Sequence, residues 1–376
     1  MTHRLHLAVL FALFAAPPVA PQEGPVIHLD LPSVGTKPGL VLVIGRVEGT
    51  PPFALEVQDQ AVPVEIQPET NLWQVSVSLE PGNHLLRMKL TDGTGAVVTK
   101  SADVLSLRGW TFGEDRPIHH VSDADELVAA LGPERIVVLR PGDYHLDRTT
   151  AESVHLSRKE GSGNAALQDL EDLLLVGTAG ERTRIVTERR GGTALTLERC
   201  TGVRLIGLEL DHATPTGALS EDVGDAGGAL NVRFSEQVWV QDCDLRGVGV
   251  GLRATKAVGL VVDHGAIQDC TQGIATLKNS SQVEFFDARL LRNGSGRTGD
   301  FGLLVEGADR GTLRFVRCEL RQNRPGPEVG LFTIDGKGRR VLFSKGVIED
   351  NLAKHLRGGE AGDELDVADS RVQSFP

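Results

Sequence analysis

Three residues that can transfer protons recur at a regular spacing in the second half of the chain. Asp242, His264 and Asp287 lie 22 and 23 positions apart, Asp263 precedes His264, and Arg317 follows 30 positions after Asp287. Paired carboxylates can hydrolyse a glycosidic bond. An imidazole or a cation beside acids can abstract a proton next to a uronate carboxylate, and acids with backbone oxygens can bind Ca²⁺. A solvated structural surface would show the same residues.

The spacing belongs to a strand repeat. Six consecutive units place Leu or Ile seven positions after an apolar residue: Val203–Leu210, Val238–Leu245, Leu260–Ile267, Val283–Leu290, Leu313–Leu320 and Val341–Ile348. Apolar residues alternate within a unit, as in Val283-x-Phe285, which is the period of a β-strand. Units of at least 22 residues that cannot bury a face alone predict a stacked β-solenoid.

Stacking brings the candidate residues together. Coils about 4.8 Å apart place Asp242, His264, Asp287 and Arg317 in one column beside Asp263. We expect these five residues to share a solvent-open groove next to residues 211–226. Val240 and Phe285 should point inward, whereas Trp239 and Glu284 should point outward and tolerate substitution.

A second column contains asparagine. Three places after each closing residue stand Ala213, Val248, Cys270, Asn293, Asn323 and Asn351. Stacked asparagines can exchange amide hydrogen bonds between coils, which satisfies polar groups at a buried corner. This column supports the fold and needs no functional explanation.

Two insertions are further candidates. Residues 211–226 contain Asp211, Asp222 and Asp225, which are candidate metal ligands in a loop that could border a groove. Residues 294–300, flanked by Arg292 and containing Arg297, could meet an anionic substrate. Exposed arginines are more often simply solvated.

The N-terminal region has a different texture. About seven short alternating runs separated by turn residues at 25–107 predict a β-sandwich. Its stretches Val43-Ile44-Gly45-Arg46-Val47, Leu79-Glu80-Pro81-Gly82-Asn83-His84 and Leu90-Thr91-Asp92-Gly93-Thr94-Gly95 resemble bacterial immunoglobulin-like domains. The resemblance implies a spacer or a carbohydrate-binding domain. Trp73 is the one candidate sugar platform, although a lone Trp in an alternating strand usually belongs to the core.

A short helix capped by Ser122 should open the second domain at 110–376 and cover the first coil. The strand that follows, Ile136-Val137-Val138-Leu139-Arg140-Pro141-Gly142-Asp143-Tyr144, and the later repeats resemble the right-handed parallel β-helix superfamily of pectate lyases and polygalacturonases. Asp263-His264-Gly265 is only faintly similar to the Gly-His-Gly element of polygalacturonases. Their paired-aspartate and Arg-Ile-Lys motifs, and the Arg-rich signature of pectate lyases, are missing.

Composition and the N-terminus limit the partners. A net charge of −12 offers no basic surface for nucleic acid. Residues 1–20 resemble an export signal, with Arg4 before the apolar run 7–16. We therefore expect a secreted or periplasmic protein without membrane insertion after signal removal. Its four cysteines lie on different coils or bends and should remain free thiols.

The sequence thus predicts an all-β protein, with an immunoglobulin-like sandwich followed by a right-handed parallel β-helix. We expect recognition of an extracellular or cell-wall polysaccharide, which could be acidic; the resemblance is specific for the fold and leaves open whether the protein also cleaves the polymer as a lyase or a hydrolase. A surface or periplasmic scaffold, or an assembly factor, is the alternative. The sequence indicates no specific cofactor, and Ca²⁺ is a metal that its acidic residues could bind.

Overall fold

The computed structural model describes most of the chain between residues 24 and 373. The described residues are 24–29, 34–37, 40–57, 64–68, 70–78, 82–106, 116–159, 164–178, 182–189, 191–213, 227–247, 249–307, 312–335, 340–353, 355–359 and 364–373. The expected export signal at 1–20 lies outside them. Within these ranges, no helix has the length and apolar character needed to cross a membrane.

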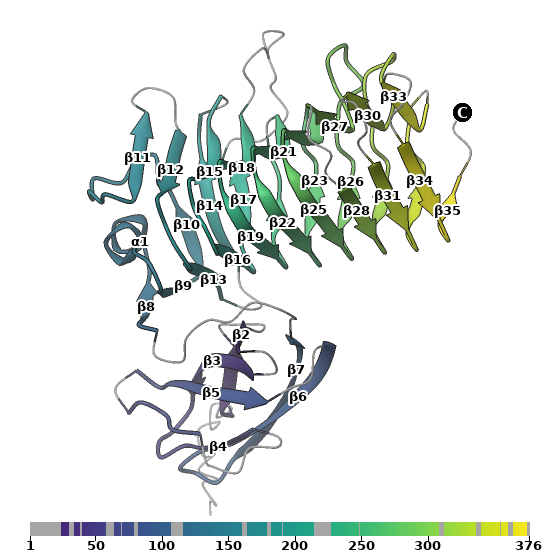
Figure 1. Ribbon diagram of the computed structural model, residues 1–376. Coiled ribbons are helices and arrows are strands. Elements are labelled where there is room, and N and C mark those ends of the chain that lie inside the picture. The colour runs from purple at the N-terminus through teal and green to yellow at the C-terminus, as the bar shows by residue number, and fades with distance from the viewer. Residues whose placement is uncertain are drawn as a thin grey trace, which may run out of the picture.

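The N-terminal region is a two-sheet β unit (Figure 1). Its strands are β1 (Val26–Leu29), β2 (Val34–Lys37), β3 (Leu40–Glu48), β4 (Ala54–Val57), β5 (Leu72–Ser78), β6 (Gly82–Thr91) and β7 (Val97–Ser106). Among the described residues, β1, β2, β3 and β5 form one antiparallel sheet, and β4, β6 and β7 form the other. Side chains from both sheets share one core, which makes the unit a sandwich; its immunoglobulin-like topology remains a prediction. Trp73 is buried in that core and is not a sugar platform.

A strand and a helix open the solenoid. Strand β8 (Ile118–Val121) pairs in parallel with β9 and adds one strand to the edge of the sheet. Helix α1 (Ala124–Ala130) follows and buries Leu127 and Val128 in the solenoid core. The expected cap at Ser122 is wrong by one residue. The side chain of Asp123 accepts a hydrogen bond from the backbone N–H of Glu126 at 2.8 Å. The backbone N–H and the hydroxyl of Ser122 donate to the carboxylate of Glu126.

The described strands from β8 onward form three long sheets (Figure 1). Sheet 1 contains β8, β9 (Ile136–Leu139), β13 (Leu174–Gly177), β16 (Arg204–Ile206), β19 (Glu236–Gln241), β22 (Val258–Asp263), β25 (Ser281–Phe286), β28 (Thr312–Val316), β31 (Arg340–Ser344) and β34 (Glu364–Ala368). Sheet 2 contains β10 (Gly142–Tyr144), β14 (Thr183–Thr187), β17 (Glu209–His212), β20 (Asp244–Leu245), β23 (Ala266–Gln268), β26 (Arg289–Leu291), β29 (Glu319–Arg321), β32 (Val347–Glu349) and β35 (Arg371–Val372). Sheet 3 contains β11 (Leu156–Lys159), β12 (Asn164–Gln168), β15 (Thr193–Glu198), β18 (Gly228–Arg233), β21 (Val250–Thr255), β24 (Gly273–Lys278), β27 (Leu303–Glu306), β30 (Phe332–Asp335) and β33 (Arg357–Gly359).

This strand order defines a parallel β-helix. Each coil takes one strand from each sheet in turn, and each strand pairs in parallel with the equivalent strand of the next coil; the pair β11–β12 is antiparallel. Parallel crossover connections are almost always right-handed. The molecule is therefore the right-handed parallel β-helix that the sequence predicts.

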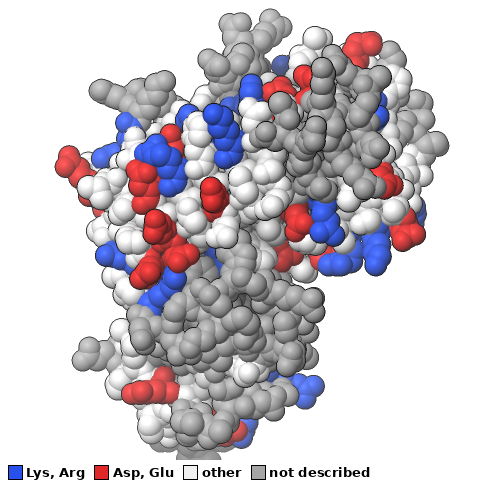
Figure 2. Space-filling view, viewed as in Figure 1, with Lys and Arg blue, Asp and Glu red and all other residues white. Residues whose placement is uncertain are grey.

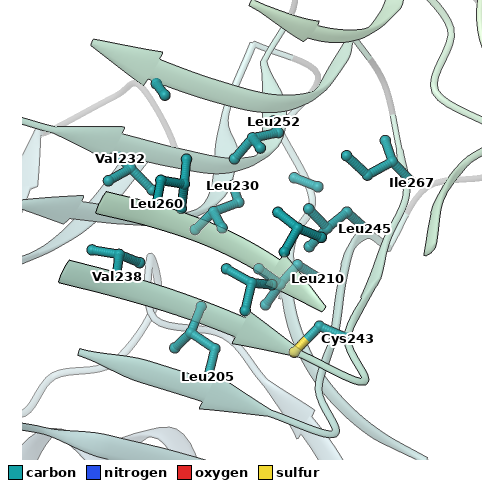
Figure 3. Close-up of a cluster of buried hydrophobic side chains, with 14 of the residues drawn as sticks. Leu205, Leu210, Leu230, Val232, Val238, Cys243, Leu245, Leu252, Leu260 and Ile267 are labelled. Carbon is teal, nitrogen blue, oxygen red and sulfur yellow. The ribbon is translucent and has the colours of Figure 1, made fainter. Parts of the chain in front are cut away.

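The core has the predicted register. The closing residues Leu210, Leu245, Ile267, Leu290, Leu320 and Ile348 are register partners in sheet 2 and are fully buried. Figure 3 shows several of these side chains pointing into the interior together with Val238 and Leu260 of sheet 1 and Leu230 of sheet 3. Val240 and Phe285 also belong to this core. Cys200, Cys243, Cys270 and Cys318 are buried free thiols, in agreement with the sequence.

The asparagine column is confirmed at the bend after sheet 2. The amide Nδ2 of Asn293 donates to Oδ1 of Asn323 at 3.0 Å, and Nδ2 of Asn323 donates to Oδ1 of Asn351 at 2.9 Å. Each Oδ1 also accepts a backbone N–H of the preceding coil. These bonds satisfy polar groups that would otherwise be buried without partners.

The outer face of sheet 1 changes along the solenoid. Its first coils carry a small apolar cluster that is buried although it faces away from the core: Ile136, Val138, Leu174, Val176 and Ile206. Trp239, which we expected to tolerate substitution, is also only 9% exposed, and the Arg204 guanidinium lies 5.0 Å from its ring centroid. Outer positions become partly exposed from Val261 onward, except Asp263, which is still buried. The accessible part of this face therefore begins near β22.

Candidate functional site

The candidate residues lie on the bend between sheet 1 and sheet 2, here called the first bend. Asp242, His264, Asp287 and Arg317 occupy equivalent positions on consecutive coils, each in left-handed backbone conformation with φ between 50° and 55°. Backbone hydrogen bonds hold the column. The N–H groups of Asp242, His264 and Asp287 donate to the backbone carbonyl oxygens of Asp263, Phe286 and Val316, respectively, at 2.9–3.0 Å. The sequence therefore placed these residues in the correct column.

Asp263 orients the imidazole of His264. Nδ1 of His264 donates to Oδ1 of Asp263 at 2.7 Å, and Nε2 lies 3.7 Å from Oδ2 of Asp287. The hydrogen bond that His264 donates to Asp263 is the main cause that raises the pKa of His264, and the charges of nearby carboxylates add to it. This arrangement holds one ring nitrogen and leaves Nε2 to exchange protons.

Asp263 is less accessible than we expected. It lies on the outer face of sheet 1 in register with Gln241 and Phe286, yet only 5% of its surface is exposed. Gln241 is 2% exposed, and its Oε1 has no hydrogen-bond partner among the described residues. We expected that an outward position excludes burial, and this is wrong for Asp263. Its outer-face neighbours Trp239 and Gln241 on the preceding coil are buried as well, so Asp263 lies at the border of the buried part of this face.

Asp242 is the second titratable group of the site. The residue as a whole is exposed, but desolvation of its carboxyl group raises its pKa to about 6. The charge of Asp263 acts in the same direction, while His264 and the side chain of Gln241 oppose it. The pKa values of Asp242 and His264 are thus both raised, one to about 6 and the other above its ordinary value of 6.5.

Asp287 and Arg317 form a bidentate ion pair. Nε and Nη2 of Arg317 donate to the two carboxylate oxygens of Asp287 at 2.7 and 2.6 Å. The same geometry joins Arg199 to Asp169 on the bend after sheet 3, here the third bend, and Arg292 to Asp269 on the second bend, which follows sheet 2. In all three pairs the acid and the arginine occupy left-handed bend positions of adjacent coils. The pair at Asp287 is therefore a repeating structural feature.

A metal ion has competitors at this bend. Asp263, His264 and Asp287 each offer one ligand atom, and these atoms lie within 4.8 Å of one another. Nδ1 of His264 already donates to Asp263, however, and the guanidinium of Arg317 contacts both oxygens of Asp287. A metal would have to displace the hydrogen bond or share the carboxylate with a cation. The contacts thus favour proton transfer.

The candidate metal loop is described only in part. Asp222 and Asp225 lie outside the described residues. Asp211 Oδ1 accepts the backbone N–H of His212 at 2.7 Å, and its Oδ2 lies 3.7 Å from Nη1 of Arg184. Burial raises the pKa of Asp211, which makes its carboxylate a weaker ligand for Ca²⁺.

The insertion at 294–300 is organised by its own acid. Oδ2 of Asp300 accepts the backbone N–H groups of Ser295 and Arg297 at 2.7 and 3.0 Å, and the Ser295 hydroxyl at 2.7 Å. Arg292 beside it is paired with Asp269. Asp300 and Arg292 therefore have structural roles. Binding of an anionic substrate at this loop stays a prediction.

Comparisons with known proteins reveal distant structural neighbours. No protein-family model and no curated protein matches the chain. The catalytic domain of a GH87 α-1,3-glucanase solved with tetrasaccharides aligns at 8% identity and a TM-score of 0.36, covering 92% of this chain and 80% of that one. PfbA, a surface adhesin of Streptococcus pneumoniae, aligns at 8% identity and 0.31, covering 69% and 83%. The Yersinia enterocolitica family 28 exopolygalacturonase aligns at 9% and 0.21, covering 93% and 99%. At these values the likeness says nothing about what this chain acts on.

Sequence reasoning missed two features of the site. One is the repeated acid–arginine pair, although Asp169 and Arg199 are separated by 30 positions just as Asp287 and Arg317 are. The other is Phe286, a partly exposed aromatic residue on the outer face in register with Asp263. The alternation of the sequence placed Phe286 in the outward column with Asp263, next to the column of Asp287, but gave it no role in the site.

Proposed function

We propose that the solenoid binds an extracellular polysaccharide across the outer face of sheet 1 and cleaves a glycosidic bond at the first bend. In this proposal Asp242 is the general base and His264, oriented by Asp263, is the general acid. The observation that carries the proposal is the 2.7 Å hydrogen bond between Asp263 and Nδ1 of His264 on the coil next to Asp242. Like the sequence, the proposal places the protein outside the cytoplasm.

The order of the two pKa values supports these roles. The pKa of Asp242 is about 6, and the pKa of His264 lies above its ordinary value of 6.5. Between them the dominant form pairs an ionised Asp242 with a protonated His264. A carboxylate that accepts a proton and an imidazolium that donates one are then present together near neutral pH.

A non-catalytic scaffold is the second candidate. The acid–arginine pairs that recur on all three bends favour it, because they show that charged residues on these bends also serve the architecture. The scaffold explains Asp287 and Arg317 fully. It gives no account of the imidazole between two carboxylates or of the raised pKa of Asp242.

A panel of extracellular polysaccharides, assayed for new reducing ends, tests the proposal. We expect turnover on at least one polymer, and a fall of about 10²-fold or more for Asp242→Asn and for His264→Ala, since general acid–base groups contribute 10²–10⁴-fold. The matched control is Asp269→Asn, an acid at the equivalent position of the second bend, which should retain full activity.

Two results contradict the proposal. Equal losses in Asp269→Asn and Asp242→Asn would mean that bend acids act only through stability, and melting temperatures of the variants would show this. Binding without any release of reducing ends, unaffected by either site variant, would favour the scaffold.

A further inference from the structure

Two cations near the acid–base pair, one on the outer face of sheet 1 and one on the first bend, are already engaged. Arg317 binds Asp287 through two hydrogen bonds, and Nη1 of Arg314 donates to Oε1 of Glu284 at 3.0 Å. Glu284 and Arg314 are register partners on the outer face of sheet 1. A substrate carboxylate would have to break one of these pairs and leave Asp287 or Glu284 without its partner. Such an exchange gains little, because one anion merely replaces another.

The charge around the pair also disfavours an anion. Asp242, Asp263 and Asp287 surround the imidazole of His264, as their influence on its pKa shows. The chain carries a net charge of −12, and on the side drawn in Figure 2 the described part of the solenoid shows both basic and acidic side chains, with no large basic area. Like charges slow association and weaken binding. A polyuronate or a sulfated polymer would meet repulsion at this bend.

An apolar surface lies beside the pair. Phe286 and Val316 are register partners that point outward next to Asp263, and both side chains are partly exposed. Ligand sites commonly combine such apolar area with a few polar groups that fix orientation. The apolar face of a neutral sugar ring fits Phe286 and Val316, while its hydroxyl groups can donate to the carboxylates of the first bend.

We infer that the substrate is a neutral polysaccharide and that cleavage is hydrolysis, not β-elimination. This inference rests on the proposed function. Asp242 takes a proton from water as the water oxygen bonds to the anomeric carbon. The bond from that carbon to the glycosidic oxygen breaks, and the oxygen receives the proton of His264. β-Elimination would instead need a cation to neutralise a uronate carboxylate, and Arg314 and Arg317 are both committed.

Matched polymer pairs test this inference. Each pair consists of a polyuronate and its carboxyl-reduced counterpart, which share every linkage and differ only in charge. We expect the neutral member to release reducing ends at least about 10-fold faster, without the ultraviolet absorbance of unsaturated products. Phe286→Ala should raise KM for the neutral polymer by about 10-fold, with a smaller change in kcat, while the melting temperature remains close to that of the parent.

The outcomes separate the two proposals. Ultraviolet-absorbing products from the polyuronate, with or without added divalent metal, would overturn the inference and leave the proposed function in place. Faster release of reducing ends from the polyuronate would do the same. If no member of any pair is cleaved, the proposed function fails and the inference fails with it.

Discussion

The first and second bends of the solenoid both carry a bidentate acid–arginine pair, but the first bend also carries an imidazole. On the second bend Asp269 is followed one coil later by Arg292, and the two form a bidentate pair on the surface. On the first bend the corresponding pair, Asp287 and Arg317, comes after His264 on the preceding coil. The ion pair alone explains the second bend. On the first bend an imidazole remains whose contacts the architecture does not require.

The difference lies in the neighbour of the bend residue. His264 follows Asp263, a nearly buried outer-face acid that orients its ring, whereas Asp269 follows Gln268, a neutral amide whose Nε2 donates to Asp244 at 2.8–2.9 Å. Exposed ion pairs contribute little to stability and recur wherever coils stack. A carboxylate–imidazole pair placed beside a desolvated acid is the less common arrangement, and it is the better indication of a functional site.

Asp263→Asn should produce the largest effect on this comparison. Loss of the orienting carboxylate lowers the pKa of His264 towards its ordinary value, so that less imidazolium is available near neutral pH. We expect about a 10²-fold fall in kcat and an alkaline limb of the pH–rate profile that moves to lower pH. Profiles of Asp263→Asn and of the parent, with Asp269→Asn as control, check this. An alkaline limb that stays in place would show that His264 is not the acid.

Asn323→Ala should affect the second bend alone. It removes Oδ1, which accepts both the backbone N–H and Nδ2 of Asn293, and leaves buried polar groups unsatisfied. A cost of about 2 kcal/mol in unfolding free energy follows. Urea denaturation measures it, and Gln322→Ala, an exposed change on the same bend, should cost less than about 0.5 kcal/mol. Similar costs for the two variants would contradict a stabilising ladder.

Asp242→Asn should change how stability depends on pH. The folded pKa of about 6 exceeds the unfolded value of 3.8. Protonated Asp242 therefore favours the folded state below the unfolded pKa, and this contribution disappears as pH rises through about 6. Asn lacks the charge, so the variant should gain about 1 kcal/mol relative to the parent between pH 4 and pH 8, a figure reduced because the residue is exposed. His264 and Asp263 face this group and remain in both proteins. Urea denaturation at the two pH values measures the gain, and an equal difference at both would contradict the raised pKa.

Arg317→Ala and Arg292→Ala should have small and similar effects on stability. Both remove an exposed bidentate partner of a bend acid, at a cost of about 0.5 kcal/mol each. The ratio of rates on a neutral polymer and its uronate counterpart should stay the same in Arg317→Ala. A selective loss on the uronate polymer would mean that Arg317 binds substrate and that the two bends differ in this pair as well.

The sequence predicted the periodic part of the molecule and failed at its local exceptions. Alternation and spacing placed Val240 inside, His264 on a bend and Asn323 in a ladder, because a solenoid repeats one steric problem on each coil. Burial of Trp239 and Asp263 could not be predicted, since it depends on what lies against the outer face of sheet 1. The continuous apolar run from Ile136 to Leu139 was a signal that both faces are buried there. The pairing of Arg317 with Asp287 needed side-chain geometry that strand periodicity does not carry.

The position of the acid–base pair along the solenoid also determines how it moves. Asp242 and His264 follow β19 and β22, the fifth and sixth of the ten described strands of sheet 1. In a stacked repeat, local opening spreads from the ends because inner coils have neighbours on both sides. The backbone amides of these two residues should therefore exchange with deuterium as slowly as the central core. A polymer reaching this bend meets groups that are already fixed, so little ordering of the protein remains to oppose binding.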